Sequence, residues 1–170
     1  MDIIKCRICI EPLFASEKPT HCPFCGAGQK NLVAATDFEP EPIAELSDKS
    51  RQNLLRAVEL AVSNCQFYRG ASKVADTPEG EALFSGLARL EGVHVTILSR
   101  ILEQELPEDL NDIGECSPSH LENIKEGRRR EERSLHFYQR FLDESDEERV
   151  RMVLDAFLQT ETDHVALTNS

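Results

Sequence analysis

Four stretches in the C-terminal two-thirds of the chain carry apolar residues every three or four positions, the period of an α-helix packed on one side. The first covers residues 48–75 and the second 78–104; the third begins at Ser117-Pro118, and the fourth follows Ser145 and runs to Asn169. Their stripes contain Leu54, Val58, Ala61, Cys65 and Tyr68; Phe84, Leu87, Glu91, His94, Leu98 and Ile101; Ile124, Arg128, Glu131, Leu135, Tyr138 and Leu142; and Val150, Leu154, Phe157, Glu161 and His164. The pattern predicts four amphipathic helices around a shared core.

The connections between these stretches predict how the helices pair. Thr77 followed by Pro78 is typical of a helix N-cap and its first position, and Ser145 with Glu148 resembles a capping box. Both signals follow directly on the preceding stripe, so each pair of helices is expected to be joined by a tight turn. Residues 105–116 form a longer connection between the pairs. Two hairpins and one crossover predict an antiparallel four-helix bundle over residues 47–170, in a mainly α protein.

The two expected hairpins are copies of one another. Glu91-x-x-His94 returns 70 residues later as Glu161-x-x-His164, and Phe67-Tyr68 returns as Phe137-Tyr138. The copies differ seven residues before each tyrosine, where the second copy has Glu131 and the first has Ala61. A repeated helical hairpin with polar residues in its apolar stripe predicts a paired polar site inside the bundle.

The spacing of the repeated pair points to metal chemistry. Residues three apart on a helix share a face, so each glutamate points the same way as its histidine, toward the core. Burying a carboxylate alone costs several kcal/mol, and a bound cation offsets that cost. Carboxylate and imidazole suit iron, manganese or zinc, so the sequence predicts a bundle metal site with the ligands Glu91, His94, Glu131, Glu161 and His164. The alternative is a buried polar network in which Arg128, expected on the inner stripe, neutralises a carboxylate.

Four of the six cysteines form two close pairs before the bundle. Cys6-x-x-Cys9 and Cys22-x-x-Cys25 are separated by twelve residues, a spacing that brings four thiolates around zinc or iron. Residues 1–33 are too few for an independent hydrophobic core, so bound metal is expected to supply most of their folding energy. Residues 34–46, acidic and rich in proline, read as a linker.

The charge and composition of the chain limit the kinds of partner it is expected to bind. A net charge of −12 and a pI near 4.9 argue against nucleic acid and anionic membranes. The N-terminal residues lack the apolar core of a signal peptide, and the chain lacks an apolar run long enough to span a bilayer. We therefore expect a cytoplasmic protein whose cysteines bind metal rather than form disulfides.

Both modules resemble parts of the rubrerythrin family. Lys5-Cys6-Arg-Ile-Cys9 and His21-Cys22-Pro-Phe-Cys25-Gly26 are similar to the rubredoxin-type knuckles of that family, except that Ile10 stands where a glycine is usual. Glu131, Tyr138, Glu161 and His164 match the family's bundle motif, and the first copy matches except at Ala61. The resemblance covers nearly the whole chain and implies a ferritin-like bundle preceded by a rubredoxin-like domain.

The resemblance also implies an activity and its cofactors. It implies one iron or zinc ion in the four-cysteine site and one or two iron, manganese or zinc ions in the bundle. Tyr68 and Tyr138 would hydrogen-bond the ligand carboxylates, and Cys65, one turn beyond Ala61, is a less favoured ligand. The implied activity is reduction of peroxide or dioxygen with electrons from a donor protein. Family members often form homodimers through the bundle, and the sequence leaves the oligomeric state of this chain open. The alternative is a non-catalytic metalloprotein with structural zinc and a degenerate bundle site.

Overall fold

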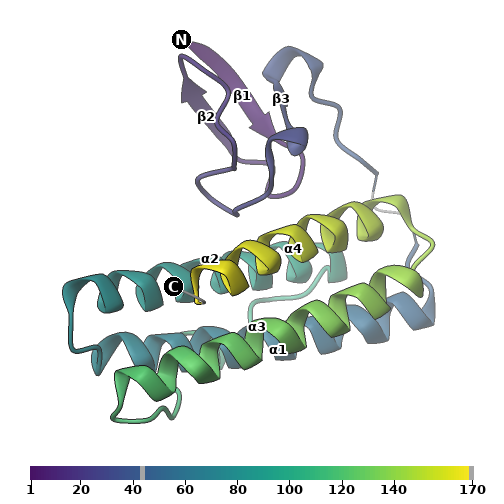
Figure 1. Cartoon of the computed structure of the whole chain (residues 1–170). Coiled ribbons are helices and arrows are strands. Elements are labelled where there is room, and N and C mark those ends of the chain that lie inside the picture. Colours follow the sequence, from purple (N-terminus) through teal and green to yellow (C-terminus); the bar gives the residue numbers. More distant parts are fainter. Residues whose placement is uncertain (43–44, 169–170) are drawn as a thin grey trace.

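The computed structural model describes residues 1–42 and 45–168, and its main body is a bundle of four long helices (Figure 1). Within those residues the helices are α1 (Asp48–Lys73), α2 (Pro78–Leu102), α3 (His120–Asp143) and α4 (Glu148–Leu167). α1 packs along α2 and α3 packs along α4, as expected for two hairpins. The crossover between the hairpins contains one short 3-10 helix, η3 (Glu108–Asn111). The expected end of the fourth helix at Asn169 lies outside the described residues.

Three of the four helices begin at a side-chain cap. Ser47, Thr77 and Ser119 each accept a hydrogen bond from a backbone N–H three residues on, which satisfies a donor that the first helical turn leaves free. The capping box expected at Ser145 is wrong. Ser145 donates its hydroxyl to the carbonyl of Phe141 and so closes the end of α3, while α4 begins after Glu147.

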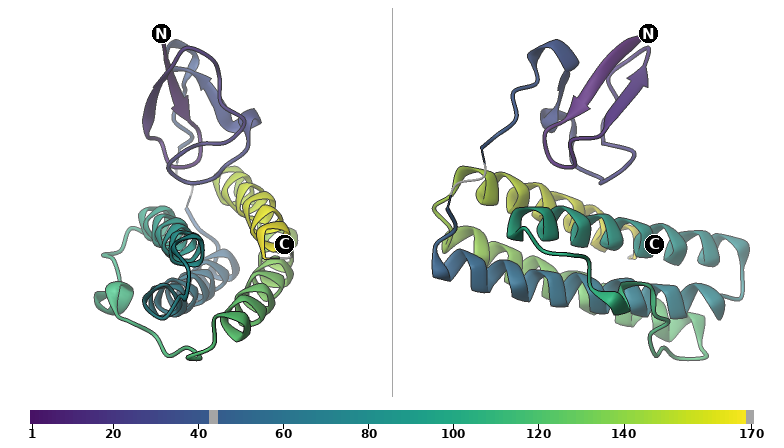
Figure 2. Two further views of the ribbon diagram at one scale, coloured as in Figure 1. Left: turned by 60° about the vertical axis from the view of Figure 1, so that its left-hand side comes forward. Right: turned by 180° about the vertical axis from the view of Figure 1, so that it is seen from behind.

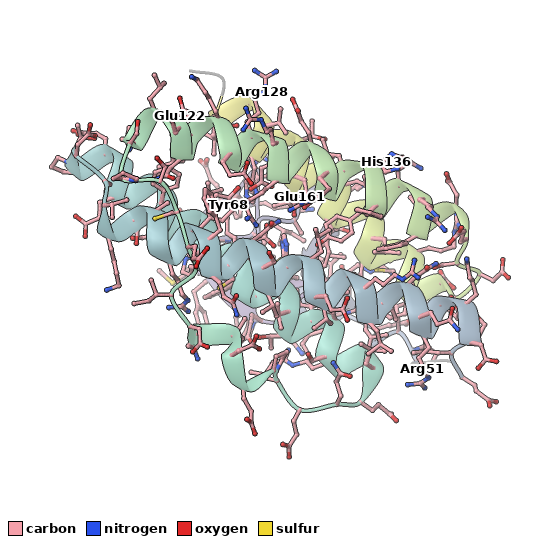
Figure 3. All side chains as sticks on the ribbon, turned by 90° about the horizontal axis from the view of Figure 1, so that it is seen from below. Arg51, Tyr68, Glu122, Arg128, His136 and Glu161 are labelled. Carbon is pink, nitrogen blue, oxygen red and sulfur yellow. The ribbon has the colours of Figure 1, made fainter. Side chains whose placement is uncertain are left out.

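The stripes predicted for α1, α2 and α4 are buried in full, but the stripe of α3 is turned. Gly127, Ser134 and Tyr138 are buried with Glu131, whereas Arg128 is exposed and pairs with Glu132 at 2.9 Å. At about 100° per residue, Arg128 lies about 60° from Glu131 on one side, and the buried residues lie on the other. The expectation that Arg128 faces the core is therefore wrong, and Figure 3 shows its side chain directed away from the bundle.

The N-terminal residues form a three-stranded antiparallel sheet with the order β2-β1-β3. Its strands are β1 (Asp2–Cys6), β2 (Pro12–Ala15) and β3 (Leu32–Ala34), and two 3-10 helices flank β3, η1 (Gln29–Asn31) and η2 (Ala35–Asp37). This module lies over the α2 and α4 side of the bundle (Figure 2). Residues 43–44 of the expected linker lie outside the described residues. None of the helices in the described part of the chain is long and apolar enough to cross a lipid bilayer.

Candidate metal centres

Among the described residues, side chains that could hold a metal ion gather in two places, one in the N-terminal module and one in the bundle core. The first brings together the four predicted cysteines, all buried and none of them in a disulfide. Cys6 Sγ lies 3.7 Å from Cys25 Sγ, and Cys9 Sγ lies 3.7 Å from Cys22 Sγ. A tetrahedron with metal–sulfur bonds of 2.3 Å has edges of about 3.8 Å. These two distances match that edge, and all four sulfurs lie within 4.8 Å of one another, so the cluster fits a zinc or iron ion.

The two knuckles share one backbone conformation. In each, the residue after the second cysteine donates its N–H to the carbonyl of the first: Ile10 to Cys6 at 3.0 Å, and Gly26 to Cys22 at 2.9 Å. Both donors have positive φ, 64° at Ile10 and 77° at Gly26. A β-branched residue is rare in this region and costs on the order of 1–3 kcal/mol. Ile10, which stands where the related knuckles usually have glycine, therefore keeps the knuckle geometry at the cost of backbone strain.

The four thiols differ in acidity. The pKa of the Cys22 thiol is lowered, chiefly by its hydrogen bond with Cys25 and next by that with Cys6. The pKa of the Cys25 thiol is raised, chiefly by its hydrogen bond with Cys22. Thiolates are the form that ligates metal, and metal binding would release the remaining protons.

The second cluster lies in the bundle, where all five predicted side chains converge. Two groups of ligand atoms each fall within 4.8 Å, and Glu161 belongs to both. The first joins Glu91 and His94 to Glu161, and the second joins Glu131 and His164 to it. At most 3% of any of these residues is exposed. Figure 3 shows Glu161 inside the bundle beneath α3, and Tyr68 also directed inward.

The distances within the core cluster fit ligands that share an ion. His94 Nδ1 lies 3.4 Å from Glu161 Oε1 and 3.8 Å from Glu91 Oε2. His164 Nδ1 lies 3.2 Å from Glu161 Oε2 and 3.5 Å from Glu131 Oε2. Octahedral bonds of 2.1 Å separate ligand atoms by about 3.0 to 4.2 Å. Because each oxygen of Glu161 faces a different histidine, this carboxylate occupies a bridging position between two half-sites.

Burial and mutual charge perturb the acidities in the core. Burial raises the pKa of Glu131 well above its ordinary value, and the charge of Glu161 raises it further. Burial also acts to raise the pKa of Glu161, but its interactions with Glu131, His164 and His94 outweigh burial and hold that pKa low. Burial acts to lower the pKa of His94, but Glu161 and Glu91 raise it to about 9. Protons therefore balance the carboxylates here, and a cation that binds must displace them.

The two tyrosines of the repeat are in unequal environments. Tyr68 donates its hydroxyl to Glu131, so α1 and α3 are joined inside the core. Tyr138 is the repeat counterpart of Tyr68, and the counterpart of Glu131 is Ala61. Within the described residues the buried hydroxyl of Tyr138 has no hydrogen-bond partner. Because Ala61 has no carboxylate, it cannot give Tyr138 the hydrogen bond that Tyr68 makes with Glu131.

Two core residues were missed by sequence reasoning. Asn64 and Ser134 are fully buried, and Asn64 Nδ2 lies 3.1 Å from both Ser134 Oγ and Glu91 Oε1. They are 70 residues apart, so the repeat pairs them with each other. The sequence does contain a signal for them: each copy of the repeat has a polar residue one helical turn after the Ala61/Glu131 position.

The remaining candidates stand apart from the core cluster. Cys65 is buried, but its thiol is a hydrogen-bond donor to the backbone carbonyls of Ala88 and Leu110, at 3.3 and 3.6 Å. Its pKa is raised by burial, so the thiolate is disfavoured. Two histidines also lie outside the cluster: His136 is exposed, and His120 is half-buried against the Phe84 ring.

The N-terminal module contacts the bundle at residues adjacent to the core ligands. A β-carbon on Gly26 would lie 2.8 Å from Thr160 and 3.8 Å from Leu90, so the knuckle backbone rests directly on α4 and α2. Thr160 and Leu90 are repeat counterparts, and each immediately precedes a core glutamate. The second knuckle therefore sits over the centre of the repeat.

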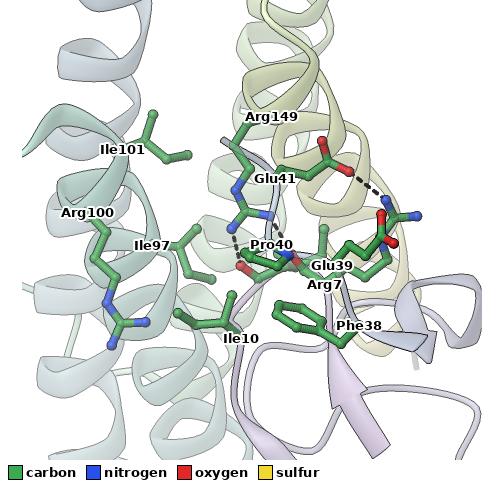
Figure 4. Close-up of a pocket in the computed structure, with 11 residues that line it drawn as sticks. Arg7, Ile10, Phe38, Glu39, Pro40, Glu41, Ile97, Arg100, Ile101 and Arg149 are labelled. Carbon is green, nitrogen blue, oxygen red and sulfur yellow. Dashed lines mark hydrogen bonds and ion pairs between the residues drawn. The ribbon is translucent and has the colours of Figure 1, made fainter. Parts of the chain in front are cut away.

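Arginines anchor the first knuckle to the same two helices. Arg149 of α4 donates to the carbonyls of Arg7 and Ile8, and Arg100 of α2 donates to that of Cys9 at 3.2 Å. They line a junction cavity of about 230 Å³ (Figure 4). The cationic guanidinium groups stand beside the four-cysteine cluster and favour a negatively charged thiolate site.

No protein-family model and no curated protein matches this chain. Among solved structures, the chain is similar to one described as "Hypothetical Protein Pfu-1136390-001" from Pyrococcus furiosus, with a TM-score of 0.59 and 18% sequence identity. The match covers 71% of this chain and 85% of that one. At this identity the likeness concerns the fold alone.

Proposed function

We propose that this chain is a rubrerythrin-like metalloprotein in which the four-cysteine module exchanges electrons with a ferritin-like metal site in the bundle. The observation that carries the proposal is the contact of Gly26, next to Cys25, with the residues that precede Glu161 and Glu91. A thiolate site and a carboxylate–histidine site thus adjoin within one chain. Thiolate-bound iron is suited to electron transfer, and carboxylate–imidazole sites are suited to iron or manganese.

The core residues have separate roles in this proposal. Glu131, Glu161 and His164 hold one ion tightly, with Tyr68 fixing the orientation of Glu131. Glu91 and His94 share Glu161 with a second, weaker position, because Ala61 contributes no carboxylate. When loaded, such a centre supplies reduction of peroxide or dioxygen. The protein surroundings exclude water from the ligands, which are nearly or fully buried. A separate donor protein would supply the electrons.

The absorption spectrum of anaerobically purified protein after reoxidation tests the electron-transfer role. Ferric iron in four thiolates absorbs strongly in the visible, whereas zinc is colourless, and a visible band that peroxide restores after reduction supports the proposal. A colourless protein that contains one zinc per chain and does not consume peroxide would contradict it. That result would favour the second candidate, a structural or regulatory metalloprotein, which the loss of a carboxylate at Ala61 supports.

The number of metal ions bound per bundle tests whether the carboxylate absent at Ala61 weakens the second position. Ala61→Glu is expected to raise the tightly held bundle ions from about one to about two, because the new side chain supplies the fourth carboxylate. Metal analysis of the full chain, with knuckle zinc counted separately, measures this change. Two tightly held ions in the unaltered bundle would show that another group already supplies the missing ligand.

A further inference from the structure

The half-site beside Ala61 contains a buried amide, Asn64, where the other copy of the repeat has the smaller Ser134. Asn64 follows Ala61 by one turn of α1, so it faces the same core layer. It is fully buried, where an amide is costly unless its polar atoms are paired. Its amide nitrogen contacts Glu91 and Ser134, but among the described residues its oxygen has no partner.

Most of the described ligand atoms that lack a hydrogen bond lie on this side of the core cluster. Within residues 1–42 and 45–168, both ring nitrogens of His94, Glu91 Oε2 and Glu161 Oε1 lack a hydrogen bond. On the other side, His164 is hydrogen-bonded to Glu161 at 3.2 Å and Glu131 to Tyr68, although among the described residues Glu131 Oε2 also lacks a hydrogen bond. One unpaired buried polar group costs about 1–3 kcal/mol. An excess of acceptor oxygens beside an imidazole is the environment that a divalent cation satisfies.

The contact between Asn64 and Glu91 has the spacing of neighbouring ligands. Asn64 Nδ2 lies 3.1 Å from Glu91 Oε1, and adjacent oxygens around an ion with 2.1 Å bonds lie about 3.0 Å apart. A half-turn of the amide exchanges its nitrogen and oxygen. Ser134 then donates its hydroxyl to Oδ1, because a serine hydroxyl can both donate and accept.

We propose that Asn64 is the replacement ligand for the missing glutamate, and that its side-chain oxygen, with Glu91, His94 and Glu161, binds a divalent first-row cation at the second position. This inference rests on the proposed metal site of the bundle. A neutral amide adds coordination without adding charge. The second ion is therefore bound more weakly than the first and exchanges readily, which separates this site from one built on four carboxylates.

Titration of the full chain with Mn²⁺ tests the proposal. The four-cysteine site is first filled with one equivalent of zinc, and free Mn²⁺ is followed by its electron paramagnetic resonance signal. The unaltered chain is expected to bind one ion tightly and a second weakly. Asn64→Ala should weaken the second by about tenfold or more and leave the first unchanged, and the near-isosteric Asn64→Asp should tighten the second by a similar factor.

Asn53→Ala is the matched control, since it removes another buried asparagine of α1, one that donates to Glu144 and contacts none of the proposed ligands; it should leave the second affinity unchanged. Helical circular dichroism and the tight site report whether each variant folds. The same second affinity in the unaltered chain, Asn64→Ala and Asn64→Asp would overturn the role of Asn64 while leaving the metal site standing. Failure of the unaltered chain to bind Mn²⁺, Fe²⁺ or Zn²⁺ in the bundle would instead overturn the proposed function itself.

Discussion

The unequal tyrosines of the repeat provide a matched pair of substitutions. Tyr68 donates a hydrogen bond to Glu131, whereas the Tyr138 hydroxyl is unpartnered within the described part of the chain. Both side chains are fully buried. Replacing either tyrosine by phenylalanine removes one hydroxyl from the same depth of the same core, so the two variants differ chiefly in whether a hydrogen bond is lost.

The structure sets the expected magnitudes. Tyr68→Phe loses a hydrogen bond to a carboxyl group and leaves Glu131 with one partner fewer, which costs about 1.5–3 kcal/mol of unfolding free energy. Tyr138→Phe removes a buried hydroxyl that has no partner among the described residues, so the change should be near zero or stabilising by about 1 kcal/mol. The two variants should therefore differ in unfolding free energy by about 1.5–4 kcal/mol.

Urea unfolding of the metal-free full chain, followed by helical circular dichroism at pH 7, measures this difference. With a slope of about 2 kcal/mol per molar urea, the midpoint of Tyr68→Phe should fall about 1 M while that of Tyr138→Phe stays or rises. Equal losses in the two variants would refute the reasoning, since they would show that Tyr138 makes a bond of equal strength. Repeating the pair on Ala61→Glu should make Tyr138→Phe destabilising, because the glutamate supplies its partner.

Three further predictions concern the knuckle and the surface. Ile10→Gly should stabilise the N-terminal module by about 1 kcal/mol by relieving the positive-φ strain, seen as slower loss of metal to a chelator; faster loss would contradict the strain argument. Arg128→Ala should change unfolding free energy by no more than about 0.5 kcal/mol and leave bundle metal affinity unaltered, because Arg128 is exposed and pairs with Glu132; a clear change in metal affinity would place it in the site after all. Burial acts to raise the pKa of Glu147, but hydrogen bonds from Ser50 and the Ser47 backbone lower it to about 2. The ionised carboxylate therefore stabilises the fold above pH 4.5, and this stabilisation is lost as the pH falls toward 2. Urea midpoints of Glu147→Gln and the unaltered chain should therefore differ at pH 7 and converge near pH 2, and a constant difference would refute the linkage.

Much of this organisation follows from periodicity. The stripes of α1, α2 and α4 were predictable because a buried helical face repeats every three or four residues. The cysteine hooks were predictable because their spacing matches a tetrahedral site. Both patterns are local, so neighbouring residues alone reveal them.

The errors arose where tertiary packing chooses between neighbouring faces. On α3, Arg128 and Gly127 flank Glu131 on opposite sides, and periodicity alone did not decide between them. Gly127 is inward because the Tyr68 ring packs against it; a β-carbon there would lie 3.2 Å from that ring. The capping box predicted at Ser145 is wrong for a similar reason, since a serine hydroxyl can cap the end of one helix as readily as the start of the next.

The placement of the N-terminal module over the repeat, and the pairing of Asn64 with Ser134, could not be derived from local pattern. Both depend on which surfaces meet after the hairpins fold. The 70-residue offset contained part of this information, since it relates Leu90 to Thr160 and Asn64 to Ser134.

The central claim is that the core binds metal asymmetrically. The most direct measurement is a crystal structure of the full chain reconstituted with Mn²⁺ and zinc, with anomalous scattering recorded for each metal. The account predicts zinc among Cys6, Cys9, Cys22 and Cys25, strong manganese signal among Glu131, Glu161 and His164, and a weaker signal beside Glu91 and His94. A core without anomalous signal, its carboxylates paired only with protonated histidines, would contradict it.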